Sequence, residues 1–487
     1  MKTWQMYVEG KWIHAEGART YSLPNPASEE EIALAPNASV ADVGRAVAAA
    51  RRAFDEGPWP RTPAAERADL LDRIADGIER RKDEFRDVLV SAHGAEFVTH
   101  GPQLDQPIQL FRTYAALTRG YEFESLLPLV EQATPAGSNL VSSLLVRQPV
   151  GVCALIPTWN YPLWVTVQKV APAIGAGCTM VVKPSPWGPL IDLLLAEVAA
   201  EAGLPEGVLN VVCGESPEIG PRLVSDPRID KVSFTGSNAT GKRIMESAAK
   251  NLTRVHLELG GKSALIVLDD FDLGPAVPSA ASTAFFHAGQ GCAMNSRVLV
   301  SRSRHDELVA KMVEFVKAVV KVGDPADPSV MLGPVIRPER RAEIEEYIAS
   351  GREEGADLAT GGGRPANLER GWFVEPTIFG NVRPDMRIAR EEIFGPVVSV
   401  IPFDDEEDAL RIANDSDYGL FGGILSNDRR RAIEMAKRIR TGGISINGAT
   451  NTFQKPSGGF KHSGIGRENG RFGLEEYTEL QVVMWPN

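Results

Sequence analysis

The 487-residue chain has few cysteines, four in all, and none of them forms a Cys-x-x-Cys pair. A zinc site and a disulfide framework are therefore not indicated, and reduced thiols in a cytoplasmic protein are the simplest interpretation. The chain also lacks an apolar signal core between Met1 and Trp12. Its most apolar stretch, residues 149–167, contains three prolines and Asn160, which makes a poor membrane helix. We expect a cytoplasmic protein that does not enter a membrane.

Positive charge is in deficit. Lys and Arg number 52 against 64 Asp and Glu, which gives a net charge of −12. This balance excludes a nucleic-acid-binding protein that works through a broadly basic surface. The 43% hydrophobic and 24% charged residues are ordinary for a globular protein. The length corresponds to about three domains.

The first part of the chain is predicted to be helical. Residues 39–56 start with a capping box and continue at helical spacing, residues 64–91 form a second helix, and residues 92–135 keep a mostly helical pattern. Residues 138–146 differ, because leucines and a valine are interleaved with serines there. This pattern predicts a strand, and we interpret it as an arm that pairs with another subunit.

From residue 150 onward, short apolar strands alternate with helices. Such a pattern predicts a parallel sheet covered on both faces, and its recurrence in the second half predicts two α/β domains with a ligand cleft between them. The expected strands are 150–156, 179–183, 209–213, 231–234, 263–268, 298–301, 397–401 and 443–446. The expected helices are 163–176, 190–202, 275–287, 306–322, 339–351 and 430–440.

Two residues with catalytic chemistry lie in glycine-rich surroundings. Cys292 has small neighbours that let a substrate approach its sulfur, and a thiolate is a strong nucleophile toward a carbonyl carbon. It can equally be a small buried residue. Glu258 ends a strand between two leucines, and burial there would make it a base near neutral pH. The alternative is a structural carboxylate paired with Lys262.

An amide and a basic residue follow two other strands. Asn160 can stabilise an oxyanion through its side-chain N–H, although Asn beside Pro is usually a turn former. Lys183 can contact a ribose or a phosphate, and the alternative is a solvated strand end. Residues 234–241 form a glycine-containing strand-to-helix turn that suits a phosphate but lacks the GxGxxG fingerprint.

Two late motifs complete the set. Residues 391–396 place Glu392 beside Phe394, which suits a ribose and a flat ring, or else a turn with a core phenylalanine. Residues 458–468 form a glycine-rich run that is typical of a functional loop.

Together and in this order, the motifs resemble the aldehyde dehydrogenase superfamily over essentially the whole chain. The matching segments are TWNYP at 158–162, KPSP at 183–186, FTGS at 234–237, ELGGK at 258–262, GQGC at 289–292, EEIFGP at 391–396 and SGIGRE at 463–468. The resemblance implies an α/β fold with a Rossmann-like cofactor domain, an α/β catalytic domain and a β oligomerisation arm. The implied cofactor domain is 1–125 and 149–258, the catalytic domain 259–460, and the arm 126–148 and 470–487.

The resemblance also implies roles. Cys292 would form a thiohemiacetal and then a thioester, Asn160 would hold the oxyanion, and Glu258 would activate the water that releases the acid. The implied cofactor-binding residues are Ile156, Pro157, Thr158, Trp159, Lys183, Ser185, Pro186, Phe234, Thr235, Gly236, Ser237, Gly241, Leu259, Gly260, Glu392 and Phe394. The implied substrate pocket consists of Tyr161, Trp164, Gln168, Gly291, Ala293, Phe453 and Ser457. No metal is expected.

Two positions depart from the family pattern. NAD-preferring members often have a glutamate where this chain has Pro186, so NAD and NADP both stay open as cofactors, with NAD favoured. His287 lies five residues before Cys292, where many members have a small or amide residue. It can tune the thiolate, or cap a helix or bond backbone.

Three functions compete. The first is a hydrolytic NAD(P)-dependent aldehyde dehydrogenase that acts on a neutral aromatic or medium-chain aldehyde. The second is a CoA-acylating semialdehyde dehydrogenase, against which Glu258 argues. The third is a catalytically retired scaffold, against which the joint presence of Cys292, Glu258 and Asn160 argues. The expected partners are a small-molecule aldehyde and further copies of the chain, as a homodimer or homotetramer.

Overall fold

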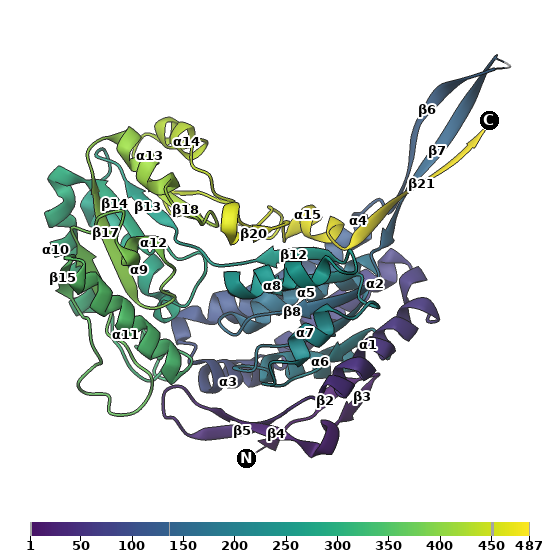
Figure 1. The fold of residues 1–487 in the computed structure, drawn as a ribbon, viewed down its shortest axis with the longest axis horizontal. Coiled ribbons are helices and arrows are strands. Elements are labelled where there is room, and N and C mark those ends of the chain that lie inside the picture. The colour runs from purple at the N-terminus through teal and green to yellow at the C-terminus, as the bar shows by residue number, and fades with distance from the viewer. Residues whose placement is uncertain (1, 136, 450–451, 487) are drawn as a thin grey trace.

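A computed structural model describes residues 2–135, 137–449 and 452–486, and it contains two large sheets, a small N-terminal sheet and a projecting ribbon (Figure 1). The small sheet joins β1 (Lys2–Thr3), β5 (Glu31–Pro36) and β4 (Thr20–Pro24). No described helix is both long and apolar enough to cross a membrane.

The first large sheet has eight strands in the order β20-β12-β11-β8-β9-β10-β2-β3. Its strands β12, β11, β8, β9 and β10 are parallel, whereas β20 pairs antiparallel with β12, β2 with β10, and β3 with β2. The bounds are β2 (Met6–Val8), β3 (Lys11–Ile13), β8 (Val152–Ile156), β9 (Thr179–Val182), β10 (Leu209–Val211), β11 (Lys231–Thr235), β12 (Arg254–Glu258) and β20 (Gly464–Ile465).

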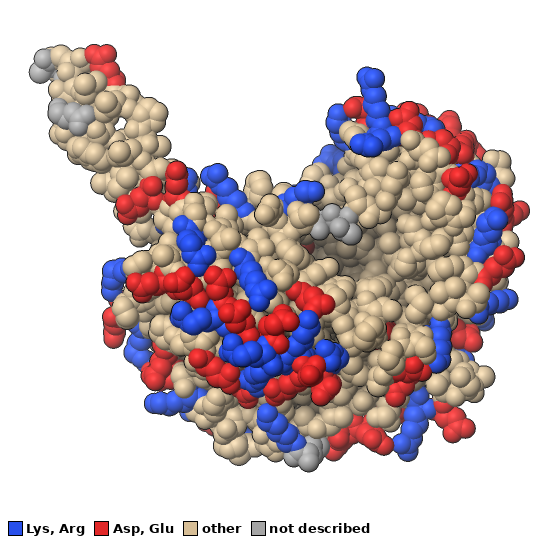
Figure 2. Space-filling model, turned by 180° about the vertical axis from the view of Figure 1, so that it is seen from behind, with Lys and Arg blue, Asp and Glu red and all other residues tan. Residues whose placement is uncertain are grey.

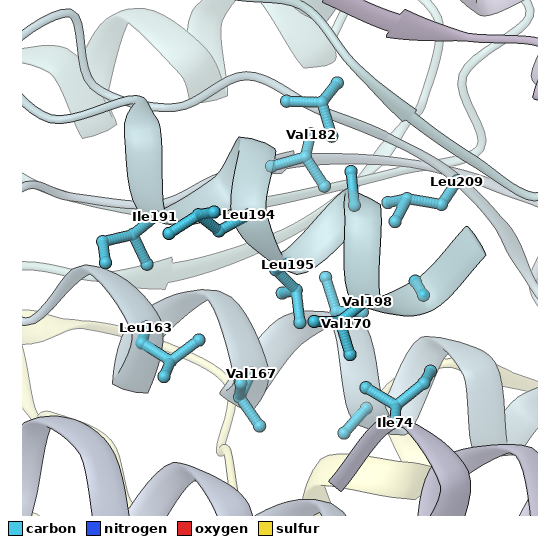
Figure 3. Packing of buried hydrophobic residues seen from close by; sticks show 14 of the residues in the cluster. Ile74, Leu163, Val167, Val170, Val182, Ile191, Leu194, Leu195, Val198 and Leu209 are labelled. Carbon is cyan, nitrogen blue, oxygen red and sulfur yellow. The ribbon is translucent and has the colours of Figure 1, made fainter. Parts of the chain in front are cut away.

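Alternation along β8 explains why this sheet is covered on both faces. Cys153 and Leu155 belong to a core with α2 (Ala64–Arg80), α4 (Gln106–Gly120), α5 (Pro162–Ala176) and α6 (Leu190–Glu201). Figure 3 shows side chains of α5 and α6 meeting in this core beside Val182 and Leu209. The alternate β8 residues face a second core with α1 (Val40–Asp55), α7 (Ile219–Val224) and α8 (Asn238–Ala248). Both faces of the strand are apolar because both lie under helices.

The second large sheet has seven strands in the order β15-β16-β17-β14-β13-β18-β19, all parallel except β15. Its strands are β13 (Ala264–Val267), β14 (Arg297–Ser301), β15 (Asp357–Thr360), β16 (Thr377–Gly380), β17 (Val397–Phe403), β18 (Gly422–Leu425) and β19 (Ser445–Ile446). Its helices are α9 (Leu273–Phe285), α10 (His305–Val319), α11 (Pro338–Glu353), α12 (Arg387–Arg390), α13 (Glu406–Asn414) and α14 (Arg429–Ala436). The predicted domain boundaries are not tested by these sheets and stay a prediction.

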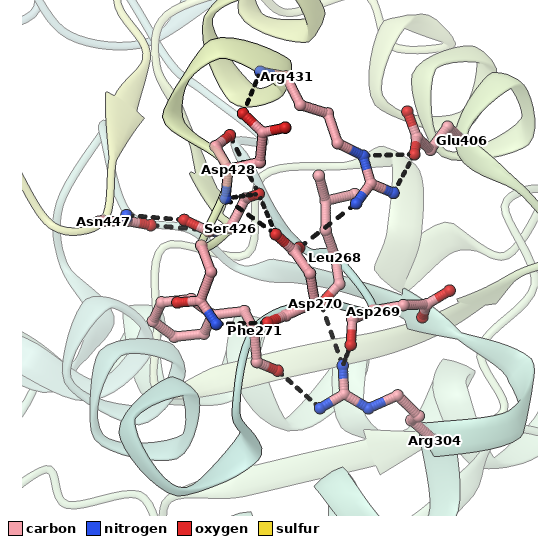
Figure 4. A network of polar contacts seen from close by, with 11 residues as sticks. Leu268, Asp269, Asp270, Phe271, Arg304, Glu406, Ser426, Asp428, Arg431 and Asn447 are labelled. Carbon is pink, nitrogen blue, oxygen red and sulfur yellow. Dashed lines mark hydrogen bonds and ion pairs between the residues drawn. The ribbon is translucent and has the colours of Figure 1, made fainter.

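A polar network closes the carboxyl ends of β13 and β18 (Figure 4). Arg431 donates to Glu406 and forms an ion pair with Asp270, and Ser426 donates to the same aspartate at 2.8 Å. Arg304 donates to the carbonyl oxygen of Phe271 at 2.7 Å. The Arg304 bond satisfies a backbone carbonyl oxygen just after β13, and the other bonds join side chains across the strand ends.

The predicted helical pattern of residues 92–135 is wrong at its end, where β6 (Glu124–Thr134) forms a ribbon with β7 (Gly137–Pro149) and β21 (Thr478–Pro486). The apolar residues 126, 127, 129 and 130 have helical spacing. However, Pro128 is incompatible with a helix interior, and the strand register shifts between Leu127 and Val130. The bulge around Pro128 therefore gives the apolar residues of this strand the spacing that is typical of a helix.

The helix predicted over residues 64–91 is two helices. It is interrupted at Arg81, which separates α2 from α3 (Lys82–His93) and has φ −102° and ψ 19°. The Arg81 side chain pairs with Glu84 and with Glu197 of α6. The break is thus associated with a contact to a distant helix, which local spacing does not reveal.

Candidate active site

A cavity of about 1050 Å³ lies where the carboxyl ends of β8, β11 and β12 face the amino ends of β13, β14 and β18. A ligand crevice at the carboxyl ends of parallel strands is typical of open α/β sheets. Figure 2 shows the molecule hollowed between its two larger parts, with mostly uncharged side chains in the hollow.

The cavity brings together most of the predicted site residues. Those that line it are Cys292, Glu258, Asn160, Thr158, Trp159, Thr235, Gly236, Ser237, Leu259, Gly260, Glu392, Phe394, Tyr161, Trp164, Gln168, Gly291, Ala293 and Ser457. The predicted residues that are not part of its lining are Ile156, Pro157, Lys183, Ser185, Pro186, Phe234, Gly241 and Phe453.

Cys292 is reached by a strained loop. After α9, a short 3-10 turn (Phe286–Gly289) places His287 and Ala288 at φ +51° each, a conformation that costs energy in non-glycine residues. Burial, followed by the charges of Glu392 and Glu258, raises the pKa of the Cys292 thiol to about 12. This shift favours the neutral thiol in the free protein.

Asn160 is fixed beside this loop. Its Nδ2 donates to the carbonyl oxygen of Gln290 at 2.7 Å, and its side chain is buried. Gln290 in turn accepts from the backbone N–H of Ile336 at 3.0 Å. An amide nitrogen carries two hydrogens, so one N–H of Asn160 holds the amide plane and the other stays available at the cavity wall.

Glu258 ends β12 and is buried. Its Oε1 has no hydrogen-bond partner among the described residues, and the same holds for the Nζ of Lys262. The alternative of an ion pair with Lys262 is therefore not what this geometry provides. Burial, reinforced by the charge of Glu468, raises the pKa of Glu258 well above its ordinary value, while Lys169 opposes the shift.

Three neighbours of Glu258 escaped the sequence reasoning as functional residues. Lys169 of α5 donates to Glu468 at 2.7 Å, and His256 Nε2 lies 3.8 Å from the Glu258 carboxylate. Residues two apart on a strand share a face, so the position of His256 was a usable signal. The lysine comes from a helix, and no local pattern links it to the strand.

The turn between β11 and α8 suits a phosphate. Ser237 is the N-cap of α8 and accepts from the backbone N–H of Thr240, and the first N–H groups of the helix lie beside the cavity. A helix N-terminus attracts an anion through these groups and its dipole. Gly236 has no room for a side chain, since a Cβ there would lie 2.4 Å from the ring of Phe234.

A carboxylate and two aromatic rings also line the cavity. Glu392 accepts from the backbone N–H of Gly261 at 2.8 Å, and burial raises its pKa to about 7. Trp159 and Phe394 meet edge to face, with ring centroids 5.5 Å apart. A ribose and a flat ring fit such a set of groups, so these residues match a dinucleotide.

Two arginines on this side were missed by the sequence reasoning. Arg337 and Arg340 line the cavity, and Arg337 stacks on Trp187, 4.5 Å from its ring centroid. Lys183 donates to the carbonyl oxygen of Pro184 at 3.1 Å, and burial lowers its pKa, so it is not simply a solvated strand end.

The other arm of the cavity is aromatic. Tyr161, Trp164 and Phe286 line it, and Phe453 stands behind Trp164 with ring centroids 5.4 Å apart. Gln168 donates to the Asn469 side chain at 3.2 Å. Phe286 is a wall residue that the sequence reasoning did not name.

The side chain of His287 contacts a buried carboxylate. Its Nδ1 lies 3.5 Å from Glu96, and its ring lies 5.2 Å from that of Tyr161. Glu96 also accepts from the backbone N–H of Gly333. The His287 imidazole therefore contacts the side chain of Glu96. The alternatives predicted from the sequence were tuning of the Cys292 thiolate, a helix cap, or a bond to the backbone.

The sequence matches the Aldehyde dehydrogenase family over residues 12–483. It is 43% identical over 483 residues to a 3-succinoylsemialdehyde-pyridine dehydrogenase from a Pseudomonas species, covering 99% of this chain and 98% of that protein. It is 41% identical over 488 residues to a betaine aldehyde dehydrogenase from Bacillus subtilis, covering 98% and 96%. A crystal structure of a Mycobacterium tuberculosis aldehyde dehydrogenase complexed with NAD+ superimposes with a TM-score of 0.94 at 43% identity, covering 100% of this chain and 99% of that one.

Proposed function

The chain belongs to the aldehyde dehydrogenase family and is an NAD(P)-dependent aldehyde dehydrogenase, and we propose that it uses Cys292, Asn160 and Glu258 to oxidise a neutral aldehyde to a carboxylic acid. The observation that carries this proposal is the convergence of the three side chains on one cavity. They come from the loop after α9, the loop between β8 and α5, and the end of β12.

The first step is attack by Cys292 on the aldehyde carbon. The thiol loses its proton to solvent in the cavity, its sulfur bonds to the aldehyde carbon, and the π electrons of the carbonyl move to the oxygen, which then carries the negative charge. The free N–H of Asn160 and the backbone N–H of Cys292 donate to that oxygen. The bond from Asn160 to Gln290 keeps the donor in place without any rearrangement during the reaction.

A bound NAD(P)+ would supply the hydride acceptor that oxidation of the carbon attached to Cys292 needs. The residues that would hold it are Ser237 and Gly236 at the phosphates, Glu392 at a ribose, and Trp159 with Phe394 at the flat ring. Arg337 and Arg340 add positive charge on the same side.

Release of the acid needs water. Glu258 takes a proton from a water molecule, the water oxygen bonds to the thioester carbon, and the carbon–sulfur bond breaks to leave the Cys292 thiolate. The Glu258 Oε1 atom, which lacks a partner among the described residues, is free to take that proton. A CoA-acylating enzyme has no use for this carboxylate, and a retired scaffold has no use for the reactive thiol.

The aromatic arm of the cavity supports a neutral substrate. Tyr161, Trp164 and Phe286 offer rings, while the charged residues of the lining on that side are Glu258, Glu468 and Lys455. Glu468 is buried and paired with Lys169, and Glu258 is buried, so neither carboxylate is an exposed partner for an ammonium group. Aromatic rings also bind quaternary ammonium ions, so a betaine-type aldehyde is the rival substrate.

One panel of steady-state assays tests both points. NAD, NADP and added CoA are crossed with hexanal, benzaldehyde, betaine aldehyde and succinic semialdehyde. Reduction without CoA, with the highest kcat/KM for hexanal or benzaldehyde, is the expected result. Reduction only with CoA would replace hydrolysis by acyl transfer, and a much higher kcat/KM for betaine aldehyde or succinic semialdehyde would replace the neutral substrate.

The ribbon supports a homodimer or homotetramer. It exposes an unusual run of apolar side chains, among them Leu126 at 73% and Leu480 at 68% of their full exposure. A strand ribbon of this kind is unstable in water unless another chain covers it.

The four free cysteines fit a reducing compartment, which supports a cytoplasmic location for the protein.

A further inference from the structure

His256 stands among three carboxylates beneath the cavity. Its Nε2 lies 3.8 Å from Glu258 Oε1 and 3.6 Å from Glu468 Oε1, and its Nδ1 lies 3.8 Å from Glu476 Oε2. The imidazole is 2% exposed. Nothing in the reaction described above uses it.

Two of the facing atoms have no hydrogen-bond partner among the described residues, namely His256 Nε2 and Glu258 Oε1. Buried polar atoms without partners destabilise a protein, so each such atom calls for a reason. These two face each other, and a movement of about 1 Å brings them within hydrogen-bond distance. A proton shared between them would satisfy both.

Carboxylates outnumber lysine ammonium groups around His256, so the cluster can accept a proton. The Glu468 carboxylate is paired with Lys169 at 2.7 Å, and the Glu476 carboxylate is paired with Lys231 at 2.9 Å. No lysine in the described part of the chain forms an ion pair with Glu258. With the imidazole neutral, the three carboxylates exceed the two lysine ammonium groups by one negative charge, and Arg467 is a further cation that acts on Glu258 from the cavity side.

We propose that His256 receives at Nε2 the proton that Glu258 removes from the hydrolytic water, and that Glu468 and Glu476 hold the resulting imidazolium. The transfer breaks the O–H bond of the Glu258 carboxyl and regenerates the carboxylate. The imidazolium then loses its proton to solvent on the side of Glu476, whose side chain is 31% exposed. The proposal rests on the proposed role of Glu258 as the base.

The environment of Glu258 and His256 brings their pKa values closer together. Burial and the charge of Glu468 raise the pKa of Glu258, so an isolated carboxyl at this place would keep its proton and fail as a base. Burial lowers the pKa of His256, against the opposing influence of Glu476 and Glu468. The two pKa values are therefore moved toward each other, which favours proton transfer between neighbours.

The test is the His256→Asn variant, which keeps a polar side chain but cannot carry a proton in the working pH range. We expect kcat to fall about tenfold at pH 7 and its acidic limb to move to higher pH, because Glu258 then retains its proton. The pre-steady-state burst of NADH should persist, since acylation of Cys292 is untouched. Hydroxylamine, which attacks a thioester without a base, should restore turnover.

His305→Asn is the matched control. His305 is also buried, but it is bonded to Asp306 and to the backbone of Asn381 in the second sheet. Its pH profile should equal that of the wild type. Glu476→Gln gives a second, milder variant outside the cavity lining, and its acidic limb should move in the same direction as that of His256→Asn.

Two results would overturn the proposal. One is a folded His256→Asn enzyme with an unchanged acidic limb. The other is a loss of the NADH burst in parallel with kcat, which indicates a structural role for the imidazole. Glu258→Gln separates this failure from failure of the proposed function. If that variant hydrolyses its thioester at the normal rate, the base itself is wrong. If it stalls while His256→Asn keeps the wild-type profile, only the histidine assignment falls.

Discussion

Gly261 lies against Cys292 so closely that a Cβ on the glycine would stand 2.3 Å from the carbonyl oxygen of the cysteine. The backbone N–H of the same glycine donates to Glu392 at 2.8 Å. The loop after β12 therefore touches both the loop that carries Cys292 and the Glu392 carboxylate. A shift of this loop moves all three groups relative to one another.

Gly261→Ala should accordingly lower kcat/KM by at least about tenfold, because the methyl group displaces the Cys292 backbone and misplacement of about 1 Å is costly in an active site. The matched control is Gly274→Ala in α9, where nothing lies within 4 Å of the added Cβ. The control should keep its activity and its melting temperature. Equal activities of the two variants would show that the added methyl group at residue 261 does not displace the Cys292 backbone.

The thiol of the free enzyme should be slow to alkylate at neutral pH. Burial and two carboxylates raise the pKa of Cys292 to about 12. As long as the pH stays below this pKa, each rise of one pH unit increases the reactive thiolate fraction about tenfold. The rate constant for iodoacetamide, followed by mass spectrometry of the peptide that contains Cys292, should rise steadily between pH 7 and pH 10. A plateau below pH 8 would mean that the free enzyme already holds a thiolate.

Glu258→Gln should separate acylation from hydrolysis. The amide cannot take a proton from water, so a thioester should accumulate on Cys292 after a normal burst of NADH, and steady-state turnover should fall by about 10² or more. Intact-protein mass spectrometry after mixing with aldehyde and coenzyme detects the added acyl group. Normal turnover without an adduct would remove Glu258 from the mechanism.

Much of the site could be predicted because its residues lie at strand ends and in glycine-rich turns, where sequence patterns are informative. Cys292, Glu258 and Asn160 are such positions, and all three line the cavity. Lys169 and Arg337 could not be found in this way. Their position depends on how α5 and the start of α11 pack against distant strands, which no local spacing encodes.

Local reasoning also failed where tertiary contacts override it. The spacing of Leu126, Leu127, Leu129 and Val130 imitates a helix, and only pairing with β7 and the bulge at Pro128 reveals a strand. Lys183, Ser185 and Pro186 follow β9 as expected, yet they do not form part of the cavity lining. Their proposed contacts with the coenzyme remain predictions.

The ribbon should be required for assembly. Val482 is 47% exposed and lies opposite Leu145 in the register of β21 with β7, so a charge there alters the apolar surface without entering a core. Val482→Asp should shift the molar mass measured by light scattering from that of an oligomer toward that of one chain. Leu252→Asp, at a residue 90% exposed after α8, is the control and should leave the mass unchanged. A wild-type protein that is monomeric at micromolar concentration would contradict the interpretation of the ribbon.

Asn160 offers the clearest measure of transition-state stabilisation in this site. Asn160→Ala should cost about 3 kcal/mol of barrier, or roughly 10² in kcat/KM, because one oxyanion donor is lost. The same change releases the carbonyl oxygen of Gln290, so part of the effect can come from the loop. Asn160→Asp keeps the shape of the side chain but repels both oxygens, so it removes both contributions without leaving a cavity, and the alkylation rate of Cys292 then separates them. If loop support were the main role, unreacted Cys292 in the two variants would be alkylated at rates that differ from the wild type. If oxyanion stabilisation is the role, alkylation stays normal, and aldehyde oxidation falls at least as far in Asn160→Asp as in Asn160→Ala.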